Sequence, residues 1–277
     1  MTTLDYLAIG HIARDLTPEG VRLGGTATYA ALTARALGLR AGLLTATAAD
    51  TDLSPLNGVG IHRQPSPFST TFENHYGPQG RTQFLRARAA TLNDFDIPPD
   101  WQAASIVHLA PIAREVPPHM PARFPGAFIG LTPQGWLRQW DDHGRVSPAP
   151  WEDADSLLAA ASAVVISIED VAGDWELAEG WAARAAVLAV TAGERGATVF
   201  ARGSRRHIPA PVERVVDATG AGDIFAAAFF VRLWQTADPW DAARFAVALA
   251  SDSVTRVGIE GVPKQSTMHN SQGTMPE

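Results

Sequence analysis

Nine consecutive residues, Val215–Asp223, decide how this chain folds, and they read Val-Val-Asp-Ala-Thr-Gly-Ala-Gly-Asp. They lead directly into an apolar helical pattern. The three small residues before the final aspartate leave backbone N–H groups uncovered at the start of that helix, where amides and the helix dipole bind anions. A carboxylate beside such a site can accept the proton of a substrate hydroxyl. The stretch therefore predicts phosphoryl transfer to an alcohol, with Asp223 as the base and phosphoryl oxygens held by the amides of Gly220, Ala221 and Gly222.

A glycine-rich turn followed by an acid has an ordinary structural explanation as well. For a bare Gly-x-Gly-Asp, a plain loop with an aspartate capping a helix is the more frequent case. The full string carries more information, because five fixed positions arise by chance in a chain of 277 residues with odds on the order of one in a few thousand. The stretch is therefore interpreted as a catalytic turn.

The rest of the chain alternates between short apolar runs and helical patterns. Leu4–Gly10 is apolar, Thr26–Gly38 is an alanine-rich helical segment, and Leu39–Thr45 is apolar again. This order predicts an α/β protein with a central, mostly parallel sheet and helices on both faces. Further strands are predicted at 105–109, 127–131, 163–168 and 186–190, a terminal pair at 198–201 and 207–209, and helices at 151–161, 175–185, 223–235 and 239–255.

One segment departs from this alternation. From Ser69 to Arg88 polar and apolar residues interleave around Gly77-Pro78-Gln79-Gly80, which predicts a β-hairpin with a glycine-rich turn. Its faces are mixed, as expected of a lid or a subunit contact. The sequence thus predicts one domain over residues 1–277, with a β-hairpin lid inserted at about residues 64–92 and a frayed polar tail beyond Lys264.

Composition narrows the function. The net charge of −7 and the pI of about 5.6 argue against nucleic-acid or anionic-membrane partners. The absence of cysteine excludes disulfides and thiolate sites and agrees with a cytoplasmic location. No apolar run is long enough to span a membrane, and the N-terminus does not read as a signal peptide. Motifs of P-loop enzymes, Rossmann dehydrogenases, serine hydrolases and zinc sites are absent from the sequence.

With these features the chain resembles the ribokinase-like carbohydrate kinase (PfkB) family. That family carries an Asp-Thr-x-Gly-Ala-Gly-Asp signature, which Asp217–Asp223 matches except that Ala218 replaces the usual Thr. Thr191–Gly196 resembles the family's nucleotide loop, and Gly24-Gly25 its N-terminal substrate motif. The resemblance extends from about residue 4 to residue 263. It implies nucleotide binding by Thr191, Gly193, Gly196, Asp217 and Thr219, and substrate binding by Asp15, Gly24 and Gly25.

Two positions depart from the family pattern. Where the family often has Asn-x-x-Glu, tied to Mg²⁺ and phosphate positioning, this chain has Ser167-Ile168-Glu169-Asp170, so the expected metal-side carboxylate is Asp170, with Glu169 as the alternative. Tyr29 replaces the sugar-binding asparagine of ribokinases, which argues against ribose bound in the ribokinase manner. Residues expected to line the acceptor pocket, at strand ends or on the lid, are Tyr29, Phe72, Asn74 and Gln134, with His108, Trp136 and Arg138 as further candidates.

The resemblance implies an ATP- and Mg²⁺-dependent kinase that phosphorylates a hydroxyl of a sugar, a polyol or cyclitol, or a nucleoside. It also implies a small β lid that pairs two copies into a homodimer. The alternative belongs to a different class, a sensor that holds nucleotide or metabolite without turnover, and Ser167 and Tyr29 motivate it. An intact Asp223 and anion site favour the enzyme, because neither is needed for binding alone.

Overall fold

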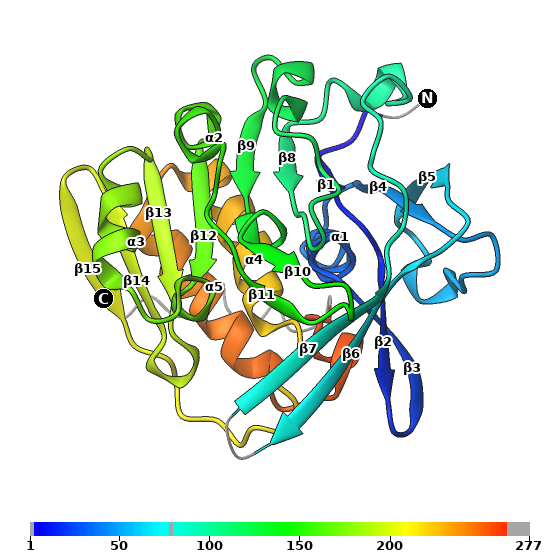
Figure 1. Cartoon of the computed structure of the whole chain (residues 1–277). Helices are drawn as coiled ribbons and strands as arrows, with labels where there is room; N and C mark the ends of the chain where they lie inside the picture. The colour runs from blue at the N-terminus through cyan, green and yellow to red at the C-terminus, as the bar shows by residue number, and fades with distance from the viewer. Residues whose placement is uncertain (1–2, 78–79, 265–277) are drawn as a thin grey trace.

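A nine-stranded sheet forms the centre of the part of the chain that the computed structural model describes, residues 3–77 and 80–264 (Figure 1). Its strands follow the order β15 (Ser204–Ile208), β14 (Ala197–Ala201), β13 (Val187–Thr191), β12 (Ala163–Ser167), β9 (Phe128–Leu131), β8 (Ile106–Leu109), β1 (Tyr6–Ile9), β4 (Ala41–Thr47) and β5 (Gly60–Pro65). Every neighbouring pair is parallel except those that β14 makes with β13 and β15. The predicted mostly parallel sheet is therefore confirmed.

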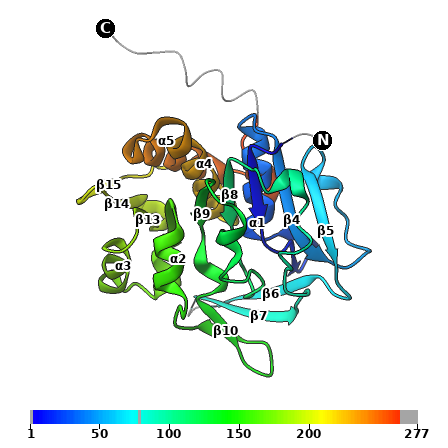
Figure 2. The ribbon, with the colours of Figure 1, turned by 90° about the horizontal axis from the view of Figure 1, so that it is seen from above.

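The inner strands of the sheet are mostly apolar because helices cover both of its faces, and every side chain of β1 and β8 is buried, whereas the outer strands β5 and β15 are largely polar. Figure 2 shows α1 (Thr26–Ala36), α4 (Ala221–Thr236) and α5 (Pro239–Ser253) on one face, and α2 (Ala154–Ala160) and α3 (Trp175–Ala182) on the other. All five helices were predicted. The short 3₁₀ helices are η1 (Ser54–Leu56), η2 (Pro99–Trp101), η3 (Met120–Arg123), η4 (Pro133–Gly135), η5 (Ile168–Val171), η6 (Gly193–Arg195) and η7 (Gly258–Gly261). No helix within the described ranges is long and apolar enough to cross a membrane.

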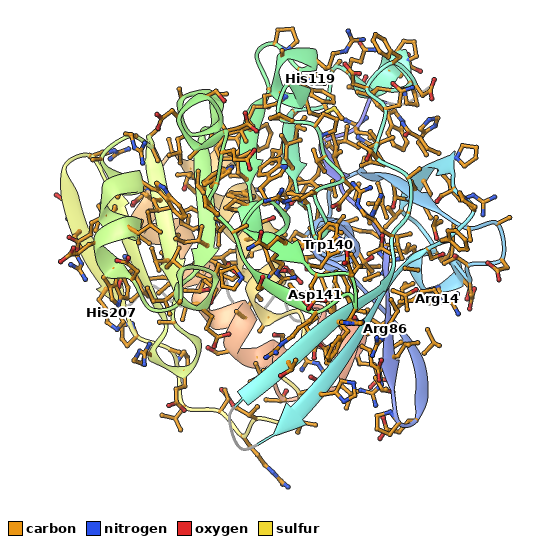
Figure 3. The ribbon with its side chains drawn as sticks, in the orientation of Figure 1. Arg14, Arg86, His119, Trp140, Asp141 and His207 are labelled. Carbon is orange, nitrogen blue, oxygen red and sulfur yellow. The ribbon has the colours of Figure 1, made fainter. Side chains whose placement is uncertain are left out.

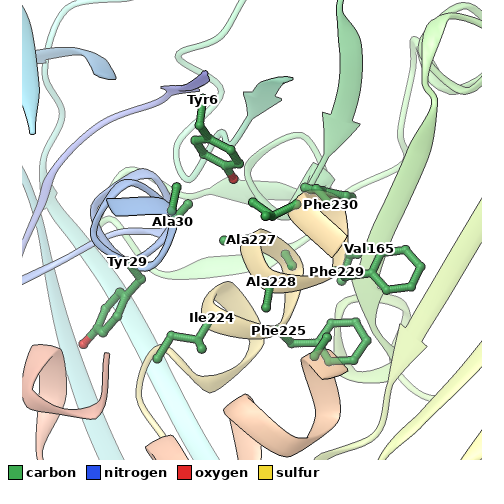
Figure 4. Packing of buried hydrophobic residues seen from close by; sticks show 14 of the residues in the cluster. Tyr6, Tyr29, Ala30, Val165, Ile224, Phe225, Ala227, Ala228, Phe229 and Phe230 are labelled. Carbon is green, nitrogen blue, oxygen red and sulfur yellow. The ribbon is translucent and has the colours of Figure 1, made fainter. Parts of the chain in front are cut away.

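Helix α4 is deeply buried along its middle. Its residues from Ile224 to Val231 are almost fully buried, and Phe230 packs against the middle of the sheet (Figure 4). A Cβ on Gly130 of β9 would come within 2.5–2.8 Å of the Phe230 ring, so that strand needs a glycine where the ring lies. Close packing of this kind fixes the position of α4 and, with it, the turn at its N-terminus.

A second sheet of four strands forms the lid beside the central sheet. Its order is β3 (Gly20–Gly24), β2 (Ala13–Thr17), β6 (Thr70–Gly77) and β7 (Gly80–Ala87). The predicted hairpin is present as β6 and β7, while Pro78, Gln79 and the tail beyond Lys264 lie outside the described residues. Arg86 of β7, labelled in Figure 3, pairs across the hairpin with Glu73 of β6 at 2.6 Å.

The lid is larger than the sequence analysis predicted. Residues 13–24 add β2 and β3, a segment in which the sequence analysis predicted no strand. These strands form because β2 pairs in parallel with β6, a partner more than 50 positions away in the sequence. The analysis also missed β5 and the short pair β10 (Arg138–Trp140) and β11 (Val146–Pro148), for which no alternating pattern is evident.

A buried acid fixes the point where the chain leaves the sheet for the lid. Glu115 is fully buried, and its carboxylate accepts backbone N–H groups of His11 at 2.9 Å, Ile112 at 3.0 Å and Ala113 at 2.7 Å. His11 follows β1, and its imidazole in turn bonds Thr70 at the start of β6 at 2.7 Å. Buried backbone donors need such partners. This network therefore sets the position of the lid relative to the sheet.

Candidate active site

The turn before α4 has the form that the sequence predicts. Gly220 caps the helix with a φ of 80°, in the left-handed region that favours glycine. Gly222 is exposed, and a Cβ there would meet nothing within 4 Å. The first N–H groups of a helix have no acceptor within it, and Ala221 makes only a long bond of 3.3 Å to the Ala218 carbonyl. The turn can therefore offer its amides to an anion.

Asp217 holds this turn in shape. Its carboxylate accepts the N–H of Thr219 at 2.9 Å and the N–H of Gly258 in η7 at 2.9 Å, and Arg22 of the lid lies 3.9 Å away. Burial raises the pKa of Asp217, but these hydrogen bonds and the Arg22 charge outweigh it and leave the pKa below its usual value. Asp217 is therefore ionised at neutral pH and ties the turn to η7, while nucleotide binding by Asp217 and Thr219 stays a prediction.

Asp223 is a half-buried acid at the third position of α4. Burial raises the pKa of Asp223, a side-chain hydrogen bond with Thr26 lowers it, Asp170 raises it and Arg138 lowers it, so that its pKa is about 6. A base should have a pKa near the pH at which it works. The sequence analysis missed Thr26, although it directly follows the double glycine and opens α1. The structure thus brings α1, α4 and η5 together around one carboxylate.

The lid presents its predicted substrate residues on one face. Asp15 of β2 pairs in register with Phe72 of β6 and with Arg22 of β3, and Asn74 lies two positions beyond Phe72 on the same side of the strand. Phe72 packs on Ile112 of the body, so this face looks toward the central sheet. Asn74 accepts a hydrogen bond from Gln83 at 3.0 Å. The half-buried Asp15 also acts electrostatically on Asp223.

Glycine is needed at both positions of the double glycine, because a Cβ at either one would clash. A Cβ on Gly24 would lie 2.1 Å from the carboxylate oxygen of Asp15, so glycine lets that carboxylate lie against the backbone. Gly25 caps α1 with a φ of 94°, and a Cβ there would come 2.7 Å from the His11 carbonyl. The motif therefore brings α1 and Thr26 close to the lid.

Four of the candidate pocket residues are packing residues instead. Tyr29 is 2% exposed with its ring against Gly220, and Phe72 is 4% exposed in the contact between lid and body. Trp136 stacks on Trp151 and donates its indole N–H to the Val116 carbonyl at 2.9 Å. His108 is fully buried between Tyr6 and Thr132, and burial lowers its pKa to about 3. Tyr29 was expected at the acceptor site from the family pattern, Phe72 from its place on the lid, and His108 and Trp136 from strand ends, but tertiary packing buries all four side chains.

Gln134, Ser167 and Asp170 form one polar group at the ends of β9 and β12. Asp170 accepts the backbone N–H of Ser167 at 2.9 Å and the Gln134 amide at 3.3 Å, and the Ser167 hydroxyl accepts the N–H of Glu169 at 3.1 Å. Ser167 and Asp170 therefore cap η5 reciprocally. Ser167 and Asp170, which stand where the family has Asn-x-x-Glu, therefore act as a pair.

The surroundings of Asp170 could hold a cation whose other ligands are mainly the phosphates of a bound phosphoryl donor. Within residues 3–77 and 80–264, no three or more histidine, aspartate or glutamate side chains gather to hold a metal by themselves. Asp170 nevertheless lies close enough to Asp223 to raise its pKa, and Mg²⁺ commonly binds through one or two carboxylates, waters and phosphates. Glu169 is exposed and lines a separate hollow of about 480 Å³ with Trp175 and Arg195. Of the two predicted acids, Asp170 is the better placed.

The predicted nucleotide loop lies next to this group. Thr191, the last residue of β13, pairs in register with Ser167, the last residue of β12. Gly196 has a φ of 88°, and a Cβ there would come 2.1 Å from the Ile208 carbonyl, so this glycine is needed for the turn. Gly193 has a φ of 58° and open space around it. Ligands of open α/β sheets bind at such strand ends.

Comparison with known proteins shows which families and structures the chain resembles. Residues 160–265 match the pfkB family carbohydrate kinases. A cytidine kinase of Thermococcus kodakarensis is 27% identical over 252 residues, 82% of this chain and 87% of that protein. A fructokinase of Klebsiella pneumoniae is 30% identical over 172 residues, 56% of this chain and 54% of that protein. A ribokinase-family, pyrophosphate-dependent kinase solved with a pyrophosphate analog and myo-inositol has a TM-score of 0.80 and 21% identity, covering 96% of this chain and 99% of that one.

The fold and these similarities define a class of enzyme. The protein is a phosphotransferase with an alcohol group as acceptor, a kinase of the carbohydrate or nucleoside kind. It belongs to the PfkB, or ribokinase, family of carbohydrate kinases, and its sheet and lid have the ribokinase-like architecture.

Proposed function

We propose that this kinase transfers the terminal phosphoryl group of ATP to a hydroxyl of a small polyol or cyclitol, with Asp223 as the general base. The observation that carries the proposal is the position of Asp223, with a pKa of about 6, directly beside the open first turn of α4. Asp223 takes the proton of the acceptor hydroxyl as its oxygen attacks the phosphorus, and the bond to ADP breaks on the opposite side. The amides of residues 220–222 stabilise the phosphoryl oxygens. Mg²⁺, when bound with the donor, neutralises its phosphates, and Asp170 would hold it.

Hydroxyl-binding groups surround the proposed acceptor position. Asp15 and Asn74 come from the inner face of the lid, and Gln134 comes from the end of β9. Carboxylates and amides are suited to acceptors that carry several hydroxyls. Tyr29 has no side-chain amide to offer where ribokinases have asparagine, and its ring is buried. A polyol or cyclitol is therefore favoured over ribose, and the similarity to a kinase solved with myo-inositol supports the same choice.

The donor is proposed to be ATP because apolar residues stand exposed just before the anion site. Val212, Val215 and Val216 are 100%, 62% and 54% exposed on the loop that leads into Asp217. An adenine ring would cover such side chains, whereas pyrophosphate has nothing apolar to place there. Pyrophosphate is the second candidate, because a similar structure belongs to a pyrophosphate-dependent kinase.

The donor assignment is tested by measuring turnover with each donor on a panel of polyols, cyclitols and nucleosides. We expect ATP to support turnover and pyrophosphate to give less than about a tenth of it. Val215→Ser should raise the KM for ATP by about three- to tenfold, because a valine side chain contributes on the order of 1 kcal/mol when it is covered. A higher rate with pyrophosphate, and no effect of Val215→Ser on ATP, would reject ATP as the donor. If a metabolite strongly stabilises the protein against heat but neither donor gives product, the alternative of a metabolite-binding sensor without turnover is favoured.

We also propose that the enzyme is a cytoplasmic homodimer that pairs through the lid. Strand β3 is an edge of the four-stranded lid sheet, and edge strands have backbone groups that can pair with another chain. The opposite edge, β7, is partly paired within the chain, because Phe84 bridges to Arg145 and Leu85 donates its N–H to the Gly144 carbonyl at 2.8 Å. Light scattering at micromolar protein should give the mass of two chains. A monomer mass at that concentration would reject the dimer without affecting the proposed chemistry.

A further inference from the structure

The ring of Tyr29 lies directly against the proposed anion site. A Cβ built on Gly220 would come 2.3–2.5 Å from the Cε1, Cδ1 and Cζ atoms of Tyr29, so the flat side of the ring lies on the α-carbon of that glycine. Tyr29 is 2% exposed, and few other conformations are open to a ring so closely packed. The ring thus occupies the space into which the Gly220 turn would otherwise relax.

The other end of Tyr29 reaches the segment that Asp217 binds. Its hydroxyl oxygen is 3.8 Å from where a Cβ of Gly258 would stand, and Figure 4 shows the hydroxyl directed away from α1 toward the C-terminal segment drawn in red. Gly258 donates its N–H to Asp217, which also holds Thr219. Tyr29 therefore spans the same two segments, the turn and η7, that the Asp217 carboxylate joins by hydrogen bonds.

Helix α1 connects this contact to the catalytic base. Thr26 and Tyr29 are three residues apart, so they lie on the same face of the helix. Thr26 hydrogen-bonds Asp223 while Tyr29 packs on Gly220. Burial and the charges of Asp223, Asp15 and Asp217 raise the pKa of Tyr29 well above its usual value, so the phenol stays neutral among these carboxylates. The first turn of α1, which begins at the double glycine, thus contacts both parts of the phosphoryl-transfer site.

We propose that Tyr29 is a positioning residue for phosphoryl transfer, whose ring holds the Gly220 turn so that its amides point at the transferred group. The proposal rests on the proposed role of residues 220–222, and it assigns Tyr29 to the donor side of the site rather than to acceptor binding. Tyr29 acts through Gly220 and contacts no reactant. Because about 1 Å of misplacement can cost on the order of a hundredfold in rate, loss of the ring should lower kcat strongly.

The test is a double-mutant cycle between Tyr29 and Gly220. Tyr29→Leu should lower kcat by roughly 10- to 100-fold and change the KM of the acceptor by less than about threefold, whereas Tyr29→Phe, which keeps the ring, should retain most of the turnover. Gly220→Ala should also lower kcat, because its Cβ pushes into the ring. Combining Gly220→Ala with Tyr29→Leu removes that clash, so the double variant should lose less than the product of the two single losses.

Tyr6→Leu is the matched control, because Tyr6 is fully buried in the same core cluster and bonds His108. It should lower the melting temperature about as much as Tyr29→Leu and leave kcat within about threefold. If Tyr29→Leu does not fold, Tyr29→Met, which fills the space without a flat ring, replaces it in the cycle. The proposal is overturned by a folded ring-deleted variant with unchanged kcat, by equal kcat losses in Tyr6→Leu, or by strictly multiplicative losses. If one of these results is obtained and Asp223→Asn still loses turnover, the Tyr29 proposal is rejected and the proposed function is retained.

Discussion

Replacing Asp223 with asparagine is expected to lower turnover by ~10²–10⁴-fold, the range for loss of a general base. The amide keeps the size of the side chain and its bond to Thr26 but cannot take the proton of the acceptor hydroxyl. Steady-state kinetics at saturating donor and acceptor measures the loss directly. Because the change is nearly isosteric, the KM values of both substrates should move by only about threefold.

Asp238→Asn is the matched control for this experiment. Asp238 also stands at a helix N-terminus, where it caps α5 by accepting the N–H groups of Trp240 and Asp241. Asparagine caps helices about as well as aspartate. Turnover should therefore survive in Asp238→Asn. Equal losses in the two variants, or full turnover in Asp223→Asn, would mean that Asp223 is only a helix-capping residue.

The stability of the Asp223→Asn variant should change in the opposite direction from its activity. The pKa of Asp223 is about 6 in the fold against 3.8 for an ordinary aspartate, so folding favours the protonated form. Relative to the asparagine variant, the wild type therefore loses stability as the pH rises from about 4 to about 6, by at most about 3 kcal/mol. Asp223→Asn should melt above the wild type at pH 8, and the difference should vanish near pH 4.

Turnover is expected to fall about tenfold for each pH unit below about 6, because Asp223 acts only when it is ionised. Between pH 7.5 and pH 4 this amounts to on the order of a hundredfold. Asp217 has a lowered pKa and His108 a pKa of about 3, so neither changes charge in this range. The measurement is kcat/KM for the acceptor against pH.

A second variant separates the enzyme's titration from that of the donor, since a terminal phosphate titrates near pH 6 as well. Thr26→Val removes the hydroxyl that stabilises the ionised Asp223. The fall in turnover on the acidic side of the pH profile should therefore move to higher pH. The donor's own titration cannot move with a change in the protein. If kcat/KM falls at the same acidic pH in Thr26→Val and in the wild type, Asp223 is not the titrating group.

Much of the donor side of the site could be predicted from local sequence. The turn at Gly220 and the acid three residues on are encoded within nine residues, and helix caps depend on neighbouring residues only. The alternation of apolar runs and helical patterns also predicted the central sheet, apart from β5, and the helices α1 to α5 of the described residues. Polar residues at the ends of β9, β12 and β13 were expected at one edge of the sheet, and the register of Thr191 with Ser167 places the nucleotide loop beside η5.

The acceptor side could not be predicted in the same way. Strands β2 and β3 have no strong pattern of their own and exist through pairing with β6, which local propensity does not reveal. Phe72 and His108 were placed in the pocket because they lie on the lid and at a strand end, yet both are buried in packing contacts. Burial of an aromatic side chain depends on what the rest of the chain puts beside it.

The sequence by itself determined that the stretch from Val215 to Asp223 forms an open turn at a helix N-terminus with an acid at its edge, because the needed conformations and donors are local. Only the tertiary structure decided what surrounds that acid. Thr26, Asp170 and Arg138 come from separate segments, and together with burial they set the pKa of Asp223. Tyr29 is the sharpest case, since its contact with Gly220 joins residues 191 positions apart and turns an expected substrate residue into a support for the turn.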